Sequence, residues 1–167
     1  MLDKKDQTIL ELLQQDASLS TYKITKRTGI PQTTVLNRIK KLKAEGLIKK
    51  YTIEIDWKKL GKKIKALIFV KVDKNLEIKS KGKVGEIEQR IYQYPQVLNI
   101  KRLMGKQDFM IELVCNDLEE LNKFLITKVR STEEVADTET VVVLEEWRKW
   151  VSQQNVYQIA EKQVKTG

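Results

Sequence analysis

The sequence has 167 residues, of which 32 are Lys or Arg and 23 are Asp or Glu, and its 41% hydrophobic content is enough to bury a core in one domain or in two small ones. It contains no histidine and one cysteine, Cys115, which excludes disulfide frameworks, Cys/His zinc sites and histidine-dependent catalysis, so we expect neither an enzyme nor a bound metal or cofactor. The N-terminus lacks a signal-peptide core and no apolar run approaches the ~18–20 residues that span a bilayer, which predicts a cytoplasmic protein that does not enter a membrane.

The first helix is predicted from residue 3 to about residue 16. Asp3 is a typical N-cap residue, and the apolar positions that follow recur at helical spacing: Ile9, Leu10, Leu12 and Leu13. We expect this helix to serve as a scaffold.

A second and a third helix follow, joined by a glycine turn. Ser20 or Thr21 can cap the second helix, and Gly29 can end it, because the residue after a helix often needs a positive φ. Pro31 suits the first turn of the third helix, and Gly46 closes that helix. Two short helices around a glycine turn, the second densely basic, are typical of a helix-turn-helix DNA reader.

Positive charge is concentrated in the N-terminal half of the chain. Residues 1–83 hold 21 basic and 9 acidic side chains, whereas residues 84–167 hold 11 and 14. Nine of the basic residues lie between positions 21 and 50, where Glu45 is the single acidic residue. A charge run is usually a solvated helix face, but this density beside a glycine turn favours double-stranded DNA as the partner.

The N-terminal part of a recognition helix usually meets the bases in the major groove. Its polar side chains here have the chemistry to pair with adenine or guanine or to touch a thymine methyl group: Gln32, Thr33, Thr34, Asn37 and Arg38. A second set is expected to contact phosphates, which position the protein without reading sequence: Lys23, Lys26, Arg27, Lys40, Lys41, Lys43, Lys49 and Lys50. Thr21, at the start of the second helix, completes the candidate DNA-binding set.

The organisation of the chain changes after the third helix. Residues 47–56 alternate apolar and polar side chains, which predicts an extended segment that serves as a wing or a connector. Residues 57–63 lose apolar content and hold a glycine among charges, as linkers do. We therefore expect a DNA-binding domain at 1–56, a linker at 57–63, a second domain at 64–145 and an extension at 146–167.

The second domain is predicted to follow the order strand, helix, strand, strand, helix, strand. The expected strands are Ala66–Val72, Val97–Met104, Phe109–Cys115 and Thr138–Leu144, and the expected helices are Val84–Tyr94 and Leu118–Val129. This βαββαβ order is that of a ferredoxin-like sandwich, which places the chain in the α+β class. Glu146 to Lys165, with two tryptophans on one side, is expected to form a C-terminal helical extension.

Several conspicuous residues have ordinary structural interpretations. The run Gly105-Lys106-Gln107-Asp108, taken alone, indicates a tight turn in which the glycine supplies a positive φ and the aspartate a local side-chain bond. Cys115 is expected to be a small buried apolar residue. The acidic residues Glu133, Glu134, Glu145 and Glu146 have no metal-ligand spacing and are expected on solvated faces.

The spaced positions of both halves resemble the Lrp/AsnC, or feast/famine, family of transcription regulators. In the N-terminal half the matching residues are Leu2, Asp3, Asp6, Ile9, Leu10, Leu13, Gln14, Asp16, Gly29, Ile30, Thr34, Val35, Arg38, Ile39, Leu42, Glu45, Gly46 and Ile48. In the second half they are Pro95, Val97, Gly105, Asp108, Thr138 and the run Thr140 to Leu144. The resemblance extends over about residues 2–145, and Pro31 departs from it because many members have a capping serine there.

The resemblance implies a homodimer built through the βαββαβ domains, often assembled further, that regulates genes in response to amino acids. In such proteins a small effector sits between subunits near the turn that maps here to Gly105, Lys106, Gln107 and Asp108. By this carry-over Asp108 would bind the effector's ammonium group, the backbone N–H groups of the turn its carboxylate, and Thr138 and Thr140 would form a polar edge of the pocket.

Our first hypothesis is a sequence-specific DNA-binding transcription regulator whose assembly or DNA binding responds to a small effector, an amino acid. The alternative is an architectural protein whose oligomers wrap DNA with little sequence preference. The ratio of specific to non-specific affinity at fixed salt distinguishes the two.

Overall fold

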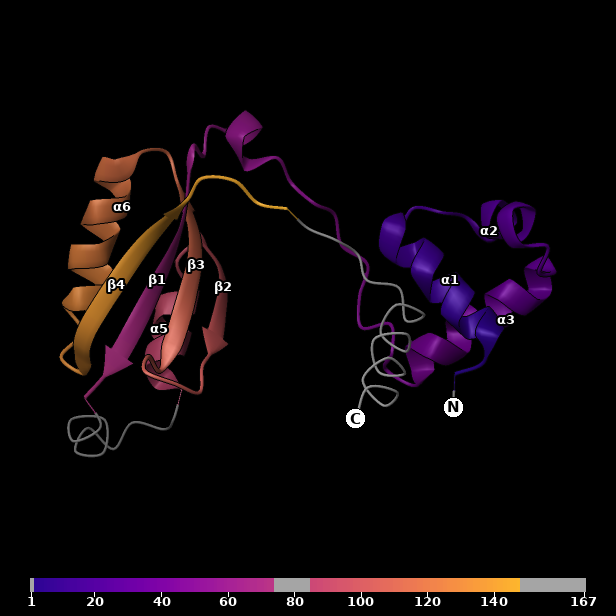
Figure 1. The fold of residues 1–167 in the computed structure, drawn as a ribbon, viewed down its shortest axis with the longest axis horizontal. Helices are drawn as coiled ribbons and strands as arrows, with labels where there is room; N and C mark the ends of the chain where they lie inside the picture. Colours follow the sequence, from indigo (N-terminus) through magenta and orange to yellow (C-terminus); the bar gives the residue numbers. More distant parts are fainter. Residues whose placement is uncertain (1, 74–84, 148–167) are drawn as a thin grey trace, which may run out of the picture. The chain divides into compact units, whose positions relative to one another are not determined.

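The computed structural model describes residues 2–73 and 85–147. The chain divides into two compact units, the first reaching Glu54 and the second running from Ile55 to Glu146 (Figure 1). Among the described residues no helix is both long enough and apolar enough to cross a membrane.

The first unit consists of three helices, α1 (Lys4–Gln15), α2 (Thr21–Thr28) and α3 (Gln32–Ala44). Asp3 caps α1 in a reciprocal box: its carboxylate accepts a bond from the Asp6 N–H at 2.9 Å, and the Asp6 carboxylate accepts one from the Asp3 N–H at 3.3 Å. Ser20 caps α2 by accepting a bond from the Lys23 N–H at 3.3 Å.

The turn between α2 and α3 is the predicted glycine turn. Gly29 ends α2 in the left-handed region with φ of 72°, a conformation that costs glycine least. Pro31 lies one position earlier than predicted, at the N-cap of α3 and not in its first turn, and it provides no side-chain bond there. Its carbonyl nevertheless accepts the Val35 N–H at 3.0 Å, so α3 begins without a serine cap.

The core of the first unit is formed by one apolar face from each helix. Its members are largely shielded from solvent and come from all three helices and their connections: Ile9, Leu13, Leu19, Ile24, Ile30, Val35, Ile39 and Leu42. Residues 47 and 48 form a bend whose N–H groups donate to the Leu42 carbonyl, residues 49–56 form no helix or strand, and a short 3-10 helix, η1 (Trp57–Leu60), follows.

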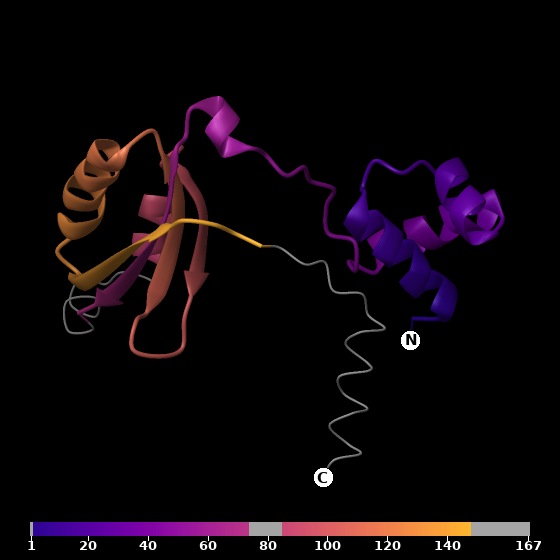
Figure 2. The ribbon, with the colours of Figure 1, turned by 45° about the horizontal axis from the view of Figure 1, so that its top comes forward.

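The second unit contains strands β1 (Ile64–Val72), β2 (Val97–Arg102), β3 (Phe109–Cys115) and β4 (Val135–Val143) and the helices α5 (Glu86–Tyr92) and α6 (Leu118–Phe124), the latter continuing as the π-helical turn η2 (Leu125–Arg130). The strands lie side by side in the order β2-β3-β1-β4 with every neighbouring pair antiparallel (Figures 1 and 2). This is the ferredoxin-like topology predicted from the sequence.

Alternate residues of β1 place one face of the sheet in the core. Ala66, Ile68 and Val70 are fully buried, and they pack with Ile87 of α5 and Phe124 of α6. Tyr94 meets the Phe124 ring edge-on at 5.6 Å, which helps fix α6 over the sheet. Both helices therefore cover one face, and no helix of the described residues covers the other face of the sheet.

Element boundaries differ from the predictions mostly by a few residues. β3 begins and ends as predicted, whereas β4 begins at Val135, three residues before the predicted start at Thr138. The predicted helix over residues 146–165 and the predicted helix start at Val84 fall outside the described residues, apart from Glu146 and Trp147, which are not helical.

Candidate DNA-binding and effector sites

The exposed side of α3 displays part of the predicted base-reading set. Thr33, Asn37 and Lys40 are exposed and recur at intervals of four and three residues, so they share one helix face. Gln32 lies at the start of the helix, where its Nε2 donates to Thr21 Oγ1 at 3.1 Å and links the beginnings of α3 and α2. Gln32, Thr33 and Asn37, all of the predicted base-reading set, therefore form a polar surface in the N-terminal half of α3, and Lys40, a predicted phosphate contact, extends it.

Arg38, predicted to read bases, is engaged within the protein. Its guanidinium contacts Asp3 Oδ2 at 2.5 Å and Asp6 Oδ1 at 2.8 Å, and the Asp6 side chain is almost fully buried. The Asp6 backbone N–H and then the Arg38 guanidinium hold the pKa of Asp3 below its usual range, while the carboxylates of Asp6 and Asp3 raise the pKa of Arg38. A base-reading role for Arg38 would require these contacts to break, so the observed geometry assigns it to holding α3 against the start of α1.

The remaining basic side chains are exposed around the three-helix unit. They comprise Lys23, Lys26 and Arg27 on α2, Lys40, Lys41 and Lys43 on α3, and Lys49 and Lys50 after it. Lys43 Nζ lies 4.5 Å from the Tyr51 ring centroid, and Lys41 pairs loosely with Glu45 at 3.8 Å. Exposed flexible cations of this kind suit phosphate contacts.

The turn Gly105–Asp108 is hydrogen-bonded to the end of β1. The Asp108 N–H donates to the Val70 carbonyl at 2.9 Å, and Asp108 Oδ2 accepts from the Val72 N–H at 2.9 Å. Lys71 Nζ donates to the Lys106 carbonyl at 2.9 Å. The turn is therefore held in place by backbone and side-chain hydrogen bonds, and one of the two oxygens of the Asp108 carboxylate is used for that purpose.

The interpretation of Gly105 as a positive-φ glycine is wrong. Gly105 is absent from the glycines in the left-handed region, and a Cβ at this position would meet nothing within 4 Å. Neither backbone strain nor crowding within this chain therefore demands glycine at this position.

The two β4 threonines lie on the other side of β1 from this turn. Thr138 is opposite Val70 and Thr140 is opposite Ile68, so β1 lies between them and β3, the strand that follows Asp108, and β4 and β3 are two strand spacings, about 10 Å, apart. Arg130 Nε donates to Thr138 Oγ1 at 2.8 Å. Thr140 Oγ1 and Gln107 Oε1 are buried without a hydrogen-bond partner in the described part of the chain, which is unusual for buried polar atoms.

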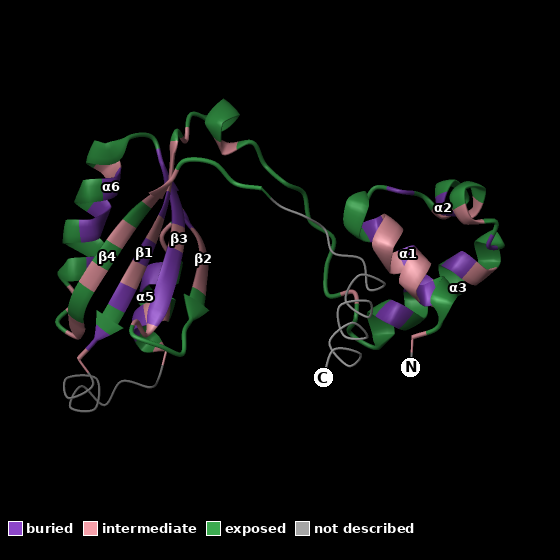
Figure 3. Ribbon diagram, in the orientation of Figure 1, coloured by how far each residue is buried: buried purple, intermediate pink, exposed green. Residues whose placement is uncertain are grey.

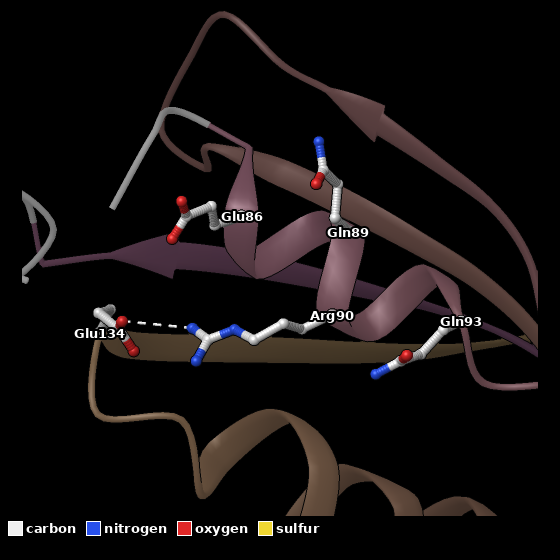
Figure 4. Close-up of a pocket in the computed structure, with 5 residues that line it drawn as sticks. All are labelled: Glu86, Gln89, Arg90, Gln93 and Glu134. Atoms are coloured by element: carbon white, nitrogen blue, oxygen red, sulfur yellow. Dashed lines mark hydrogen bonds and ion pairs between the residues drawn. The ribbon is translucent and has the colours of Figure 1, made fainter. Parts of the chain in front are cut away.

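A polar pocket of about 560 Å³ lies on the outer side of α5 (Figure 4). Its lining comes from one helix and one residue before β4: Glu86, Gln89, Arg90, Gln93 and Glu134. Arg90 Nη2 and Glu134 Oε1 are 3.2 Å apart across it, so its main opposite charges already pair with each other. The sequence analysis missed this pocket, although the spacing of Glu86, Gln89, Arg90 and Gln93 would place them on one helix face.

Metal binding has no candidate in residues 2–73 and 85–147, where acidic and cysteine side chains form no group of three that could hold an ion. Cys115 is fully buried, and burial raises the pKa of its thiol to about 11, with the Glu120 charge as a further cause. It is therefore an inert apolar residue, as predicted.

Family models and solved structures agree on both units. Residues 2–49 match a winged helix-turn-helix DNA-binding domain, and residues 65–149 match the Lrp/AsnC ligand binding domain. Curated relatives include the transcriptional regulator FL11 of Pyrococcus furiosus, 35% identical over 86% of this chain and 90% of its own, and AzlB of Bacillus subtilis, 32% identical over 91% and 94%.

Similar structures support the fold. A transcriptional regulator from Neisseria meningitidis in complex with L-Met superposes with a TM-score of 0.81 at 23% identity, covering 91% of this chain and 96% of its own. Escherichia coli AsnC gives 0.77 at 23% identity, covering 91% and 99%. The named relatives are regulators of transcription and not enzymes. The chain therefore belongs to the Lrp/AsnC family of transcription regulators and joins a sequence-specific DNA-binding helix-turn-helix to a ligand-binding domain.

Proposed function

We propose that this regulator binds an amino acid at the turn formed by Gly105, Lys106, Gln107 and Asp108, with Thr138 and Thr140 at the edge of the site, and that binding alters its action on DNA. The observation that carries the proposal is the pair of buried unpartnered oxygens, Gln107 Oε1 and Thr140 Oγ1, both within the predicted effector set. The N. meningitidis relative was solved with L-Met, which makes an amino acid the first effector class to test.

The turn has the chemistry that an amino acid needs. Asp108 supplies a carboxylate for an ammonium group, and Gly105 leaves open space in which a ligand can approach the backbone closely. Because β1 separates Asp108 from Thr140, a small effector does not reach both from within one chain. We infer that a second copy completes the pocket.

The open face of the sheet, opposite the face that carries Thr138 and Thr140, is where we expect the copy that forms the homodimer to pack. Leu67 and Phe69 of β1 and Val141 of β4 project from this face, and Val141 is 43% exposed. A Val141→Lys substitution should shift the intact protein toward monomer in size-exclusion chromatography with light scattering, because it places a charge in an apolar interface. An unchanged molar mass would exclude this face as the interface.

In the proposed mechanism a homodimer presents two α3 helices to half-sites about one helical turn, ~34 Å, apart. Gln32, Thr33 and Asn37 face the major groove, and Lys40 and the other exposed lysines contact phosphates. The functional division is a DNA-binding domain at 1–56, a linker at 57–63 and an effector and assembly domain at 64–145. The effector must bind one assembly more tightly than another, because equal affinity shifts no equilibrium.

Calorimetric titration of the intact protein with each of the twenty amino acids tests the effector site. Asp108→Asn is the sharpest variant because it keeps an acceptor for the Val72 N–H while removing the charge that an ammonium group needs. Glu119→Gln, an exposed carboxylate on α6, is the matched control. Heat from at least one amino acid, lost in Asp108→Asn and kept in Glu119→Gln, is expected; binding by none would refute the effector proposal.

A further inference from the structure

An apolar groove lies on the DNA-binding unit away from the proposed effector site. It has a volume of about 510 Å³ and runs between α1 and the segment 47–54. Leu10 and Leu13 form one wall, and Leu47, Tyr51 and Ile53 the other. Ile53 is 80% exposed, and most of this segment is coloured as exposed in Figure 3. Exposed apolar side chains gathered along one groove mark a surface that is covered in the functional state.

The end of the sheet brings the C-terminal part of the chain close to the segment that leads to this groove. Lys65, near the start of β1, is paired with Val143, at the end of β4, and its Nζ contacts Glu146 at 2.6 Å. The chain that leaves β4 therefore starts beside the chain that enters β1. Only residues 55–63 separate β1 from the last groove residue, Glu54, and nine residues span at most about 32 Å.

The sequence after Trp147 has the length and the composition to fill the groove. Twenty residues, 148–167, lie beyond the described chain, and the ligand-binding family model ends at residue 149. Apolar side chains are frequent in this segment: Trp150, Val151, Val156, Tyr157, Ile159, Ala160 and Val164. A helix of this length would extend about 30 Å.

We propose that residues 148–165 dock in the groove between α1 and residues 47–54 and cover Leu10, Leu47, Tyr51 and Ile53 with their apolar side chains. The groove is thus occupied by the C-terminal extension of this protein. The pairing of β1 with β4 places the start of this extension beside the start of β1. Docking adds a second connection between the DNA-binding unit and the sheet, besides the linker.

Hydrogen exchange on the intact protein tests the docking. Three proteins are compared with the full chain: a chain that ends at Trp147, the full chain with Ile53→Asp, and the full chain with Ile126→Asp as the matched control, because Ile126 is 52% exposed on η2 in the other unit. Truncation should accelerate exchange at residues 47–54 by at least about tenfold, and Ile53→Asp should accelerate exchange at residues 148–165. Ile126→Asp should change neither segment.

A synthetic peptide of residues 148–165 separates docking from misfolding of the truncated chain. If the peptide restores slow exchange at residues 47–54, the truncated chain is folded and the groove is its receptor. Equal exchange at residues 47–54 in the full and truncated chains would overturn the proposal. Protection that survives truncation but disappears on dilution would assign the groove to a second copy of the chain, and it would overturn the proposal as well.

Discussion

Replacing Asp6 by alanine is expected to destabilise the DNA-binding unit by about 2 kcal/mol. Asp6 is 3% exposed, and its carboxylate accepts the Asp3 N–H at 3.3 Å and contacts Arg38 at 2.8 Å. Loss of the reciprocal cap accounts for about 1 kcal/mol. The remaining loss of stability comes from the ion pair of Arg38, which loses the Asp6 carboxylate. Because Arg38 still contacts Asp3 and is partly exposed to solvent, the destabilisation stays below the ~3–5 kcal/mol of a fully broken buried ion pair.

Urea unfolding of the intact protein, followed by its helical circular dichroism, measures this change. Glu45→Ala is the control, because the Glu45–Lys41 pair at 3.8 Å joins two exposed side chains and should contribute less than about 0.5 kcal/mol. If Asp6→Ala lowered the free energy of unfolding no more than Glu45→Ala does, the contacts among Asp3, Asp6 and Arg38 would not hold α3 in place. Arg38 would then again be a candidate for reading bases.

Three further predictions follow from local features. Gly29→Ala should cost about 1–2 kcal/mol in the same unfolding assay, because φ is 72° and no atom lies within 4 Å of the added Cβ, so the cost is conformational alone; a neutral result would show that the turn relaxes. Lys40→Ala should reduce the slope of log K against log salt by about 0.9 in DNA-binding titrations, and an unchanged slope would place Lys40 away from phosphate. The pKa of Cys115 is raised to about 11, so the folded state keeps its proton longer and the free energy of unfolding should fall as the pH rises from about 9 toward 11. Cys115→Ala should remove that part of the pH dependence; an identical pH profile in the variant would contradict the assignment.

The elements predicted best were those whose limits are set by local chemistry. Gly29 and Gly46 were both predicted to end helices, Gly29 because glycine tolerates a positive φ, and both adopt φ of 72°. The start of β4 was missed because it depends on a distant partner: Val135 pairs with Val72 across a register shift, and the run Val135-Ala136-Asp137 has little strand character of its own. The change from α6 to the π-helical η2 is likewise invisible in a continuous apolar periodicity.

The candidate sites were predicted in composition but not in arrangement. The sequence places Arg38 on a basic helix, yet its partners are Asp3 and Asp6, more than thirty residues earlier, and a contact at that separation follows from helix packing alone. Similarly, the spacing of Asp108 and Thr140 along the chain does not reveal that β1 lies between them. The pocket on α5 depends on Glu134 meeting that helix across the fold, which no local pattern encodes.

We propose that an amino acid bound at the Asp108 turn changes how the protein binds DNA. The affinity of the intact protein for a DNA site selected from a random pool, measured at one salt concentration with and without each amino acid, tests this directly. We expect at least one amino acid to change the Kd by about 5- to 150-fold, and Asp108→Asn to abolish the change. A Kd that no amino acid alters, in a protein that binds the selected site far more tightly than scrambled DNA, would contradict the claim and leave a DNA-binding regulator without this effector switch.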